Sequence, residues 1–177
     1  MRKLALAELN RISVDDFKLV NKIPVSVVLD NVRSLNNIGS IFRTCDAFRI
    51  EMLYLCGITA CPPNKDIHKT ALGATESVAW EYYDETQKII QKLKAESYII
   101  LSAEQAEGSM SLEKMSFQND KKYAIVFGHE VHGVEQSIID MSDVCLEIPQ
   151  AGTKHSLNVS VSAGIVLWEA FRQLRML

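Results

Sequence analysis

The sequence predicts an α/β fold: one domain with a mainly parallel sheet and helices on both of its faces. Five short runs are apolar along most of their length and rich in Val, Ile and Leu, as in strands that are buried on both faces. Segments with apolar residues at helical spacing lie between these runs, and this alternation is typical of parallel sheets. A chain of 177 residues, 47% of them hydrophobic, is long enough to bury one such core.

The strands are assigned to the β-branched and apolar runs in chain order. They are expected at 24–30, 51–56, 98–102, 123–127 and 144–148. Ligands of parallel α/β sheets bind beyond the carboxyl ends of the strands. The loops after Asp30, Ser102, Phe127 and Ile148 are therefore the places to look for a site.

The helices are assigned from apolar spacing and from capping residues. They are expected at 3–9, 38–48, 66–72, 84–96 and from Ala163 to the C-terminal end, where Val166, Ala170 and Leu174 share one face. Asn36 or Asn37 is expected to cap the second of these helices, and Asp84 the fourth. Residues 1–22 are interpreted as a short helical extension of a single domain that spans 1–177.

Composition narrows the class of protein. A net charge of −3 and a pI near 5.8 argue against a protein that coats nucleic acid, although they leave room for a local basic patch. The four cysteines lack CxxC spacing, so reduced thiols are expected. Since no apolar run approaches the ~20 residues of a membrane span and the N-terminus lacks a signal-peptide pattern, we expect a cytoplasmic protein without a membrane partner.

The loop after the first strand contains Asn37, Gly39 and Arg43 in an N-x-G-x-x-x-R pattern. Two interpretations fit it. Asn37 can be a helix cap and Arg43 can pair with Asp46 at (i, i+3). Alternatively both side chains face the end of the sheet, where an Arg can bind a phosphate with two parallel hydrogen bonds.

The loop after 123–127 begins with Gly128 and Glu130 and returns through Gly133. Gly128 would allow a ligand to approach the backbone, and Glu130 would supply a carboxylate. His129 and His132 beside Glu130 suggest a metal site, but the spacing is not HExxH and no third ligand follows, so no metal is expected.

The third loop runs from Ile148 into the C-terminal helix. Pro149 ends the strand, Gly152 permits a turn, and Ser156, Leu157 and Asn158 follow. This segment is equally consistent with a polar cap on an amphipathic helix and with a cradle for a flat heterocycle such as a nucleoside. The neighbouring His155 and Ser156 do not indicate a catalytic triad, because adjacency in sequence does not create triad geometry.

Taken together, the three loops resemble the signature motifs of the SpoU or TrmH family of RNA ribose 2′-O-methyltransferases, in the SPOUT superfamily. The resemblance covers about 25–171. The matching residues are Asn37, Gly39 and Arg43 in the first motif, Gly128, Glu130 and Gly133 in the second, and Ile148, Pro149, Gly152, Ser156, Leu157, Asn158, Val159 and Ser160 in the third. The chain departs from the pattern at Val131 and His132, where members often carry Gly and a small or basic residue.

The resemblance implies a C-terminal trefoil knot that binds S-adenosylmethionine, a tRNA or rRNA substrate, no DNA, and a homodimer in which the Arg of the first motif reaches the partner's knot. The apolar face of the last helix is expected to contribute to that interface. By the same resemblance, cofactor contacts fall on Gly128, Ile148 and Leu157. Catalytic or RNA-facing roles fall on Asn37, Arg43, Glu130, Ser156 and Asn158.

The expected chemistry is methyl transfer to a ribose 2′-hydroxyl. Arg43 is expected to clamp a phosphate and stabilise charge on the reacting oxygen, because a guanidinium pKa above about 12 makes it a poor base. Asn37, Ser156 and Asn158 would orient the ribose or hold the loops, and Glu130 would hold Arg43 or Asn158, or accept a proton through a water. The alternative is a non-catalytic RNA- or nucleoside-binding module of the same fold.

Overall fold

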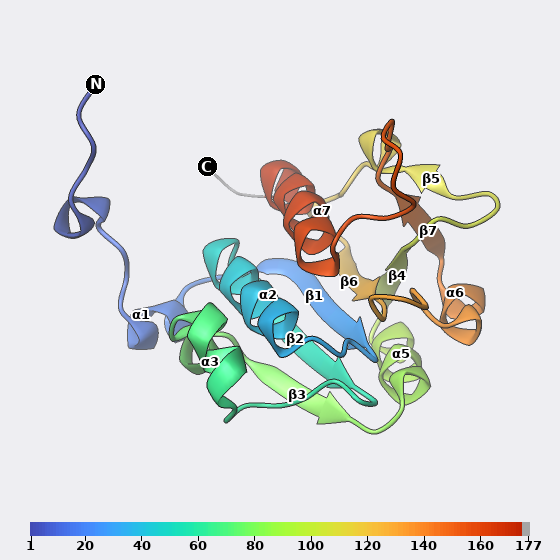
Figure 1. Cartoon of the computed structure of the whole chain (residues 1–177), viewed down its shortest axis with the longest axis horizontal. Helices are drawn as coiled ribbons and strands as arrows, with labels where there is room; N and C mark the ends of the chain where they lie inside the picture. The colour runs from blue at the N-terminus through green and yellow to red at the C-terminus, as the bar shows by residue number, and fades with distance from the viewer. Residues whose placement is uncertain (175–177) are drawn as a thin grey trace.

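The computed structural model of the chain describes residues 1–174 and contains one seven-stranded sheet in which every pair of neighbouring strands is parallel (Figure 1). The strand order is β3-β2-β1-β6-β4-β7-β5. The strands are β1 (Ile23–Asp30), β2 (Ile50–Cys56), β3 (Trp80–Tyr83), β4 (Tyr98–Ala103), β5 (Met110–Ser111), β6 (Lys122–Phe127) and β7 (Val144–Glu147). The predicted parallel sheet is confirmed, and its centre is formed by β1, β6 and β4.

Helices cover both faces of the sheet, as predicted. On one face lie α2 (Leu35–Ala47), α3 (Lys65–Ala71), α4 (Ala74–Ser77) and α7 (Val159–Leu174). On the other lie α5 (Thr86–Ala95) and α6 (Gln136–Met141). Two separate apolar clusters result, and successive residues of β1 alternate between them: Val27 and Leu29 belong to one, Val28 to the other. Because both faces of β1 are buried, its sequence is mostly apolar rather than alternating, with Ser26 and Asp30 as buried polar exceptions.

The N-terminal segment differs from the expected helix at 3–9. A 3-10 helix spans only Leu6–Leu9 and is followed by α1 (Val14–Leu19), which begins at the cap Ser13. Phe17 is buried, and α1 packs against α4. Residues 1–12 extend away from the sheet (Figure 1), and without packed neighbours a short segment forms little helix.

Several helix ends were predicted wrongly. Ser34, not Asn36 or Asn37, caps α2, since its hydroxyl accepts the backbone N–H of Asn37. Asp84 does not cap α5, because its carboxylate pairs with Lys88 at 2.9 Å. The N-cap position of α5 belongs to Glu85, whose side chain makes no capping hydrogen bond, and spacing alone does not reveal which residue occupies a cap.

Besides α1, five short elements were not predicted, namely β3, β5, α4, α6 and the 3-10 helix Leu112–Lys114. Each has six residues or fewer, and β3 lies at the edge of the sheet with a partly exposed side-chain pattern. Short, half-exposed elements carry too little apolar periodicity to be recognised.

The C-terminal helix begins earlier than expected, at Val159 rather than Ala163. Its face formed by Val166, Ala170 and Leu174 is buried in the core of this chain and is not available for an interface, so that expectation was wrong. The exposed apolar residues of α7 are Val161, Ile165 and Trp168. The trefoil knot implied by the family resemblance is not decided by strand order and stays a prediction.

All four cysteines lie in the described part of the chain and are free thiols, as predicted. Cys45 and Cys56 are buried, and burial raises the pKa of the Cys56 thiol to about 12. Within residues 1–174, no helix has the length and apolar character needed to cross a bilayer.

The contact between α2 and α3 gives a test of the fold. A methyl group on Gly39 would lie 2.1 Å from Thr70 Oγ1 and 2.3 Å from the carbonyl oxygen of Ile67. We expect Gly39→Ala to lower the free energy of unfolding by about 1–3 kcal/mol, because the two helices must separate. Urea denaturation followed by circular dichroism measures this change.

Gly164→Ala is the matched control, since nothing lies within 4 Å of the added methyl in the middle of α7. It should be neutral or raise stability by up to about 1 kcal/mol through helix propensity. Equal losses for both variants would contradict the close helix contact at Gly39.

Candidate functional site

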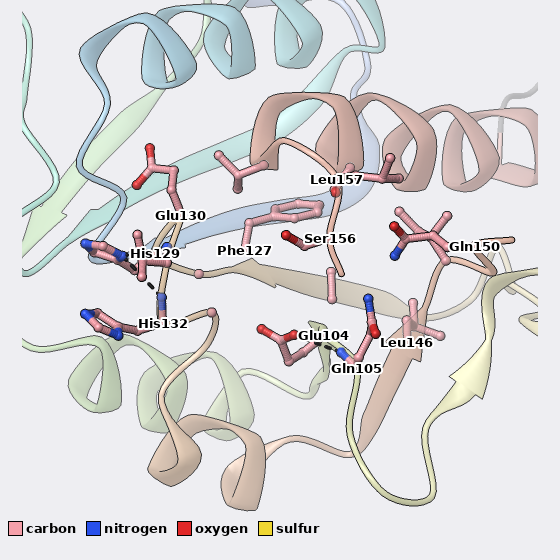
Figure 2. Close-up of a pocket in the computed structure, with 17 residues that line it drawn as sticks. Glu104, Gln105, Phe127, His129, Glu130, His132, Leu146, Gln150, Ser156 and Leu157 are labelled. Atoms are coloured by element: carbon pink, nitrogen blue, oxygen red, sulfur yellow. Dashed lines mark hydrogen bonds between the residues drawn. The ribbon is translucent and has the colours of Figure 1, made fainter. Parts of the chain in front are cut away.

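A cavity of about 220 Å³ lies at the carboxyl ends of β4, β6 and β7. Its walls come from four segments, 103–105, 127–133, 146–150 and 156–162. Figure 2 shows Phe127, Ser156 and Leu157 on one side of Glu104 and Gln105. Three of the four loops to which the sequence pointed, those after Ser102, Phe127 and Ile148, line this cavity, whereas the loop after Asp30 does not, and ligand binding there stays a prediction.

The structure brings together most of the residues that the sequence singled out. Gly128, Glu130, Ile148, Ser156 and Leu157 line the cavity. Leu157 is 38% exposed despite being apolar, and it borders the cavity rather than the core. An apolar side chain held at the rim of a cavity is available to contact the face of a bound molecule.

Asn37 and Asn158 join this group through a chain of hydrogen bonds. Asn37 Nδ2 donates to Glu130 Oε1 at 2.9 Å, and Asn158 Nδ2 donates to Asn37 Oδ1 at 3.2 Å. The three loops are thus connected side chain to side chain, although their residues are about a hundred positions apart in sequence. The loops after β1, β6 and β7 are therefore in direct contact at the carboxyl edge of the sheet.

Asn158 caps α7, one of the two alternatives that the sequence left open, and also contacts the first loop. Its Oδ1 accepts the backbone N–H of Ser160 at 2.9 Å, and its carbonyl accepts from Val161, so it caps α7. Its Nδ2 at the same time reaches Asn37. The polar turn before α7 is a helix cap and also part of the cavity wall.

Glu130 holds the start of α2 in place. Its carboxylate accepts the backbone N–H groups of Arg33 and Ser34 at 3.0 and 2.8 Å, besides the Asn37 amide. Partial burial raises the pKa of Glu130, but these three hydrogen bonds to the charged form outweigh it, and the pKa is lowered overall. The group is therefore a weak base whose oxygens are already occupied.

Glu130 was expected to hold Arg43 or Asn158 directly. It contacts neither, and reaches Asn158 only through Asn37. Its fixed position explains why a glutamate stands here: a carboxylate is the side chain that can accept three converging N–H groups.

The glycines of the second loop are required by the protein backbone itself. A methyl group on Gly128 would lie 2.1 Å from the carbonyl carbon of Gly133, because the backbones of His129 and Gly133 bond to each other in both directions. Gly133 has a φ of +69°, and a side chain there would also meet the Glu104 carboxylate. Gly128 thus allows the two ends of its own loop to approach each other closely, and it also lines the cavity, where ligand contact stays a prediction.

Arg43 lies apart from the cavity. It is exposed on α2 and borders a separate hollow of about 520 Å³ with Lys69, Thr70 and Gly164. The expected alternative, a pair with Asp46, is absent from the described residues, where Asp46 accepts from the Ser77 hydroxyl. Within one chain, Arg43 and Glu130 belong to different surfaces.

Sequence reasoning missed Glu104 and Gln105, which follow β4 and line the cavity. The only indication of these two residues in the sequence was their position after a buried strand.

His129 and His132 have ring centroids 4.8 Å apart at the cavity rim. In residues 1–174, no three His, Cys, Asp or Glu side chains are grouped as metal ligands would be.

The fold and the cavity define an α/β protein with a cavity at the carboxyl edge of a parallel sheet, where proteins of this class bind their ligands. The family model of the SpoU rRNA Methylase family matches residues 24–168, and the chain belongs to this family. The matched residues include the loops after β1, β6 and β7, which carry the three motifs, and therefore Arg43.

Curated relatives include a tRNA (guanosine(18)-2′-O)-methyltransferase of Aquifex aeolicus, 33% identical over 151 residues, which cover 83% of this chain and 68% of the relative. A 23S rRNA (guanosine-2′-O-)-methyltransferase of Vibrio parahaemolyticus is 30% identical over 94% of this chain. The chain spans only 66% of the length of that relative, and 65% of a tRNA/rRNA methyltransferase of Borreliella burgdorferi.

Solved structures agree with the fold. An AdoMet-bound rRNA methyltransferase from Sinorhizobium meliloti superposes with a TM-score of 0.82 at 26% identity, over 90% of this chain and 61% of that one. The TrmH/SpoU tRNA modifying enzyme of A. aeolicus gives a TM-score of 0.79 at 28% identity, over 90% of this chain and 81% of that one.

The lowered pKa of Glu130 leads to a prediction about stability and pH. A group whose pKa is depressed by folding stabilises the protein above its ordinary value of 4.5, and this contribution is lost as the pH falls through the folded value. We expect Glu130→Gln to cost about 1–3 kcal/mol of unfolding free energy near neutral pH, since an amide cannot accept all three N–H groups. The difference from wild type should shrink below pH 4.5.

Urea denaturation at several pH values measures this difference. Glu113→Gln is the control, because Glu113 is exposed on a short 3-10 helix and the same charge is removed there. A Glu130→Gln cost that stays constant with pH would mean that the charge of Glu130 does not hold the loops.

Proposed function

We propose that this protein transfers a methyl group from S-adenosylmethionine to a ribose 2′-hydroxyl of tRNA or rRNA. The observation that carries the proposal is the hydrogen-bond chain from Glu130 through Asn37 to Asn158, which connects the three family motifs, and the second and third of these motifs line one cavity. The relatives named as tRNA and rRNA 2′-O-methyltransferases support the same reaction and substrate class.

The cavity suits the adenosyl part of the proposed cofactor. Ile148 and Leu157 supply apolar contacts for a flat ring, and the turns at Gly128 and Gln150 offer main-chain groups to its edge. S-Adenosylmethionine supplies a methyl group that its sulfonium already activates, so the protein needs mainly to align two reactants. We assign Gly128, Ile148 and Leu157 to cofactor binding.

The reacting ribose is assigned to the side of the cavity nearest α2 and α7. Ser156 lines the cavity there, and Asn37 and Asn158 are fixed to each other and to Glu130. Fixed polar groups orient a substrate at little entropic cost during the reaction. Ser156 and Asn158 therefore position the ribose, and Glu130 supports them without acting as the base.

Arg43 is assigned to charge stabilisation at the reacting oxygen of the partner's site. It lies away from the cavity of its own chain but beside the exposed apolar residues of α7, as the shared hollow with Phe48 and Gly164 indicates. Trp168 is 47% exposed, and its ring centroid is 5.8 Å from that of Phe48. Large exposed apolar side chains of this kind favour an interface with a second copy.

Methyl transfer to bulk RNA tests the reaction and the role of Arg43. Arg43→Ala should reduce transfer about 100-fold or more, as loss of a charge-stabilising donor does, while calorimetry finds S-adenosylmethionine affinity nearly unchanged. Arg49→Ala is the control, since this exposed arginine precedes β2 at the opposite end of the sheet from the cavity. Unchanged transfer by Arg43→Ala would overturn the assignment.

The same assay also tests the second candidate function, a module that binds RNA or a nucleoside but does not catalyse methyl transfer. It would be favoured by S-adenosylmethionine binding without transfer to any RNA pool. Mapping the 2′-O-methylated nucleotides that are lost when the gene is deleted would identify the substrate nucleotide.

Mixed dimers test whether Arg43 acts across an interface. Leu157→Arg should inactivate a site by placing a cation at the cavity, where it repels the cationic cofactor. Each of Arg43→Ala and Leu157→Arg should be inactive alone. Co-expressed together, they should recover about one quarter of wild-type transfer, because half of randomly paired dimers contain one intact site of two.

Size-exclusion chromatography with light scattering accompanies this assay. Trp168→Asp should shift the protein toward monomer and lower transfer, whereas the exposed Leu72→Asp, on the α3 side, should do neither. No recovery of transfer in mixed dimers would contradict an Arg43 that serves the partner.

A further inference from the structure

The loop that carries the third motif is attached to the rest of the molecule very sparsely. Residues 149–157 form no helix or strand, and residues 149–158 are all exposed. In the described part of the chain, residues 149–157 make a single hydrogen bond to any other segment: Gln105 Nε2 donates to the carbonyl oxygen of His155 at 2.7 Å. This bond lies directly before Ser156 and Leu157, which line the cavity.

Gln105 is well placed to hold this loop. It follows β4, which lies between β6 and β7 in the sheet, so its backbone position is set by strands on both sides. The preceding residue, Glu104, is fixed by its backbone N–H to Leu146 at 3.0 Å. Figure 2 shows Gln105 beside Glu104, both at the cavity wall. The backbone next to the donor is thus anchored to the sheet through Glu104, whereas the acceptor belongs to an exposed loop without such an anchor.

Glu104 makes the complementary contact on the other side. Its Oε2 accepts the backbone N–H of Val134 at 3.0 Å, which ties it to the loop after β6. Two adjacent residues that follow β4 therefore hold the two loops that flank the cavity: Glu104 the one at 128–134, and Gln105 the one at 149–157.

We infer that Gln105 is a positioning residue for the proposed methyl transfer: its hydrogen bond to His155 holds the loop 149–157 in the conformation that binds the cofactor. This inference rests on the proposed function and adds a residue that none of the three motifs contains. It involves no contact between Gln105 and the reacting atoms.

The energetic consequence follows from the loop's sparse attachment. If a site is competent only while its loop is closed, the apparent dissociation constant rises as the closed fraction falls. One neutral hydrogen bond changes such an equilibrium by roughly three- to tenfold. Once the cofactor is bound, its own contacts keep the loop closed, so the turnover rate is much less affected than the affinity.

Two substitutions distinguish the effect of the hydrogen bond on cofactor binding from the effects of charge and of packing. Gln105→Ala removes the donor without changing charge. Gln105→Glu keeps the shape, replaces the donor by an acceptor, and adds a negative charge that by itself would attract the cationic cofactor. We expect both variants to weaken S-adenosylmethionine binding by roughly three- to tenfold, and to raise the KM for the cofactor while kcat with RNA stays close to wild type.

Trypsin provides a readout that does not depend on the cofactor. Lys154 lies in the loop next to His155, so cleavage after Lys154 reports loop opening. Without cofactor, both variants should be cut there measurably faster than wild type, because the loop is open for a larger fraction of the time. Gln118→Glu is the matched control, because this exposed glutamine lies before β6 and changes the same charge outside the cavity.

The possible outcomes are distinct. Unchanged cleavage at Lys154, or a Gln105→Glu variant that binds the cofactor as tightly as wild type, would overturn the inference. Faster cleavage with unaltered affinity would overturn it as well, since the loop would then open without affecting the site. If the wild-type chain bound no S-adenosylmethionine, the proposed function would fail, and the trypsin comparison would still decide whether Gln105 holds the loop.

Discussion

The hydrogen bonds that Glu130 accepts connect the loop after β6 to the first residues of α2, and the arrangement of the cavity depends on this connection. A carboxylate can accept several N–H groups at once, and each of the three donors would otherwise need water. Through Asn37 the same connection reaches Asn158 and the start of α7. One ionised side chain therefore links the first residues of α2 to the loop after β6 and, through Asn37, to the start of α7.

In this arrangement, the side chain that holds the loops in place is different from those proposed to take part in the reaction. A glutamate that is already hydrogen-bonded three times, with a lowered pKa, contributes position rather than proton transfer. Under the proposed function, a cofactor that is already activated leaves little for a base to do. The protein's task is then to bring a cofactor pocket, a ribose and a cation together, and rigid loops at the edge of a parallel sheet are suited to it.

Much of the fold could be predicted because its central strands are buried on both faces, which leaves continuous apolar runs such as β1 and β6. The positions of Gly128, Ile148 and Leu157 followed from the same assignment, since loops after neighbouring strands meet at one edge. What could not be predicted depends on particular side chains. The choice of Ser34 over Asn37 as the cap of α2 depends on backbone geometry, and the role of Gln105 depends on a contact fifty residues away in the sequence. Sequence periodicity also cannot tell whether Val166 faces the core or a partner.

The location of Arg43 has a consequence for how the protein would behave in a cell. Because this side chain lies on a different surface from the cavity of its own chain, a lone subunit under the proposed function would hold a cofactor without a complete active centre. The rate of methyl transfer would then rise with roughly the square of the protein concentration where most subunits are monomers. It would rise linearly where most subunits are dimers. Expression level would act as a threshold, so that newly made or highly diluted subunits stay silent toward RNA until they meet one another.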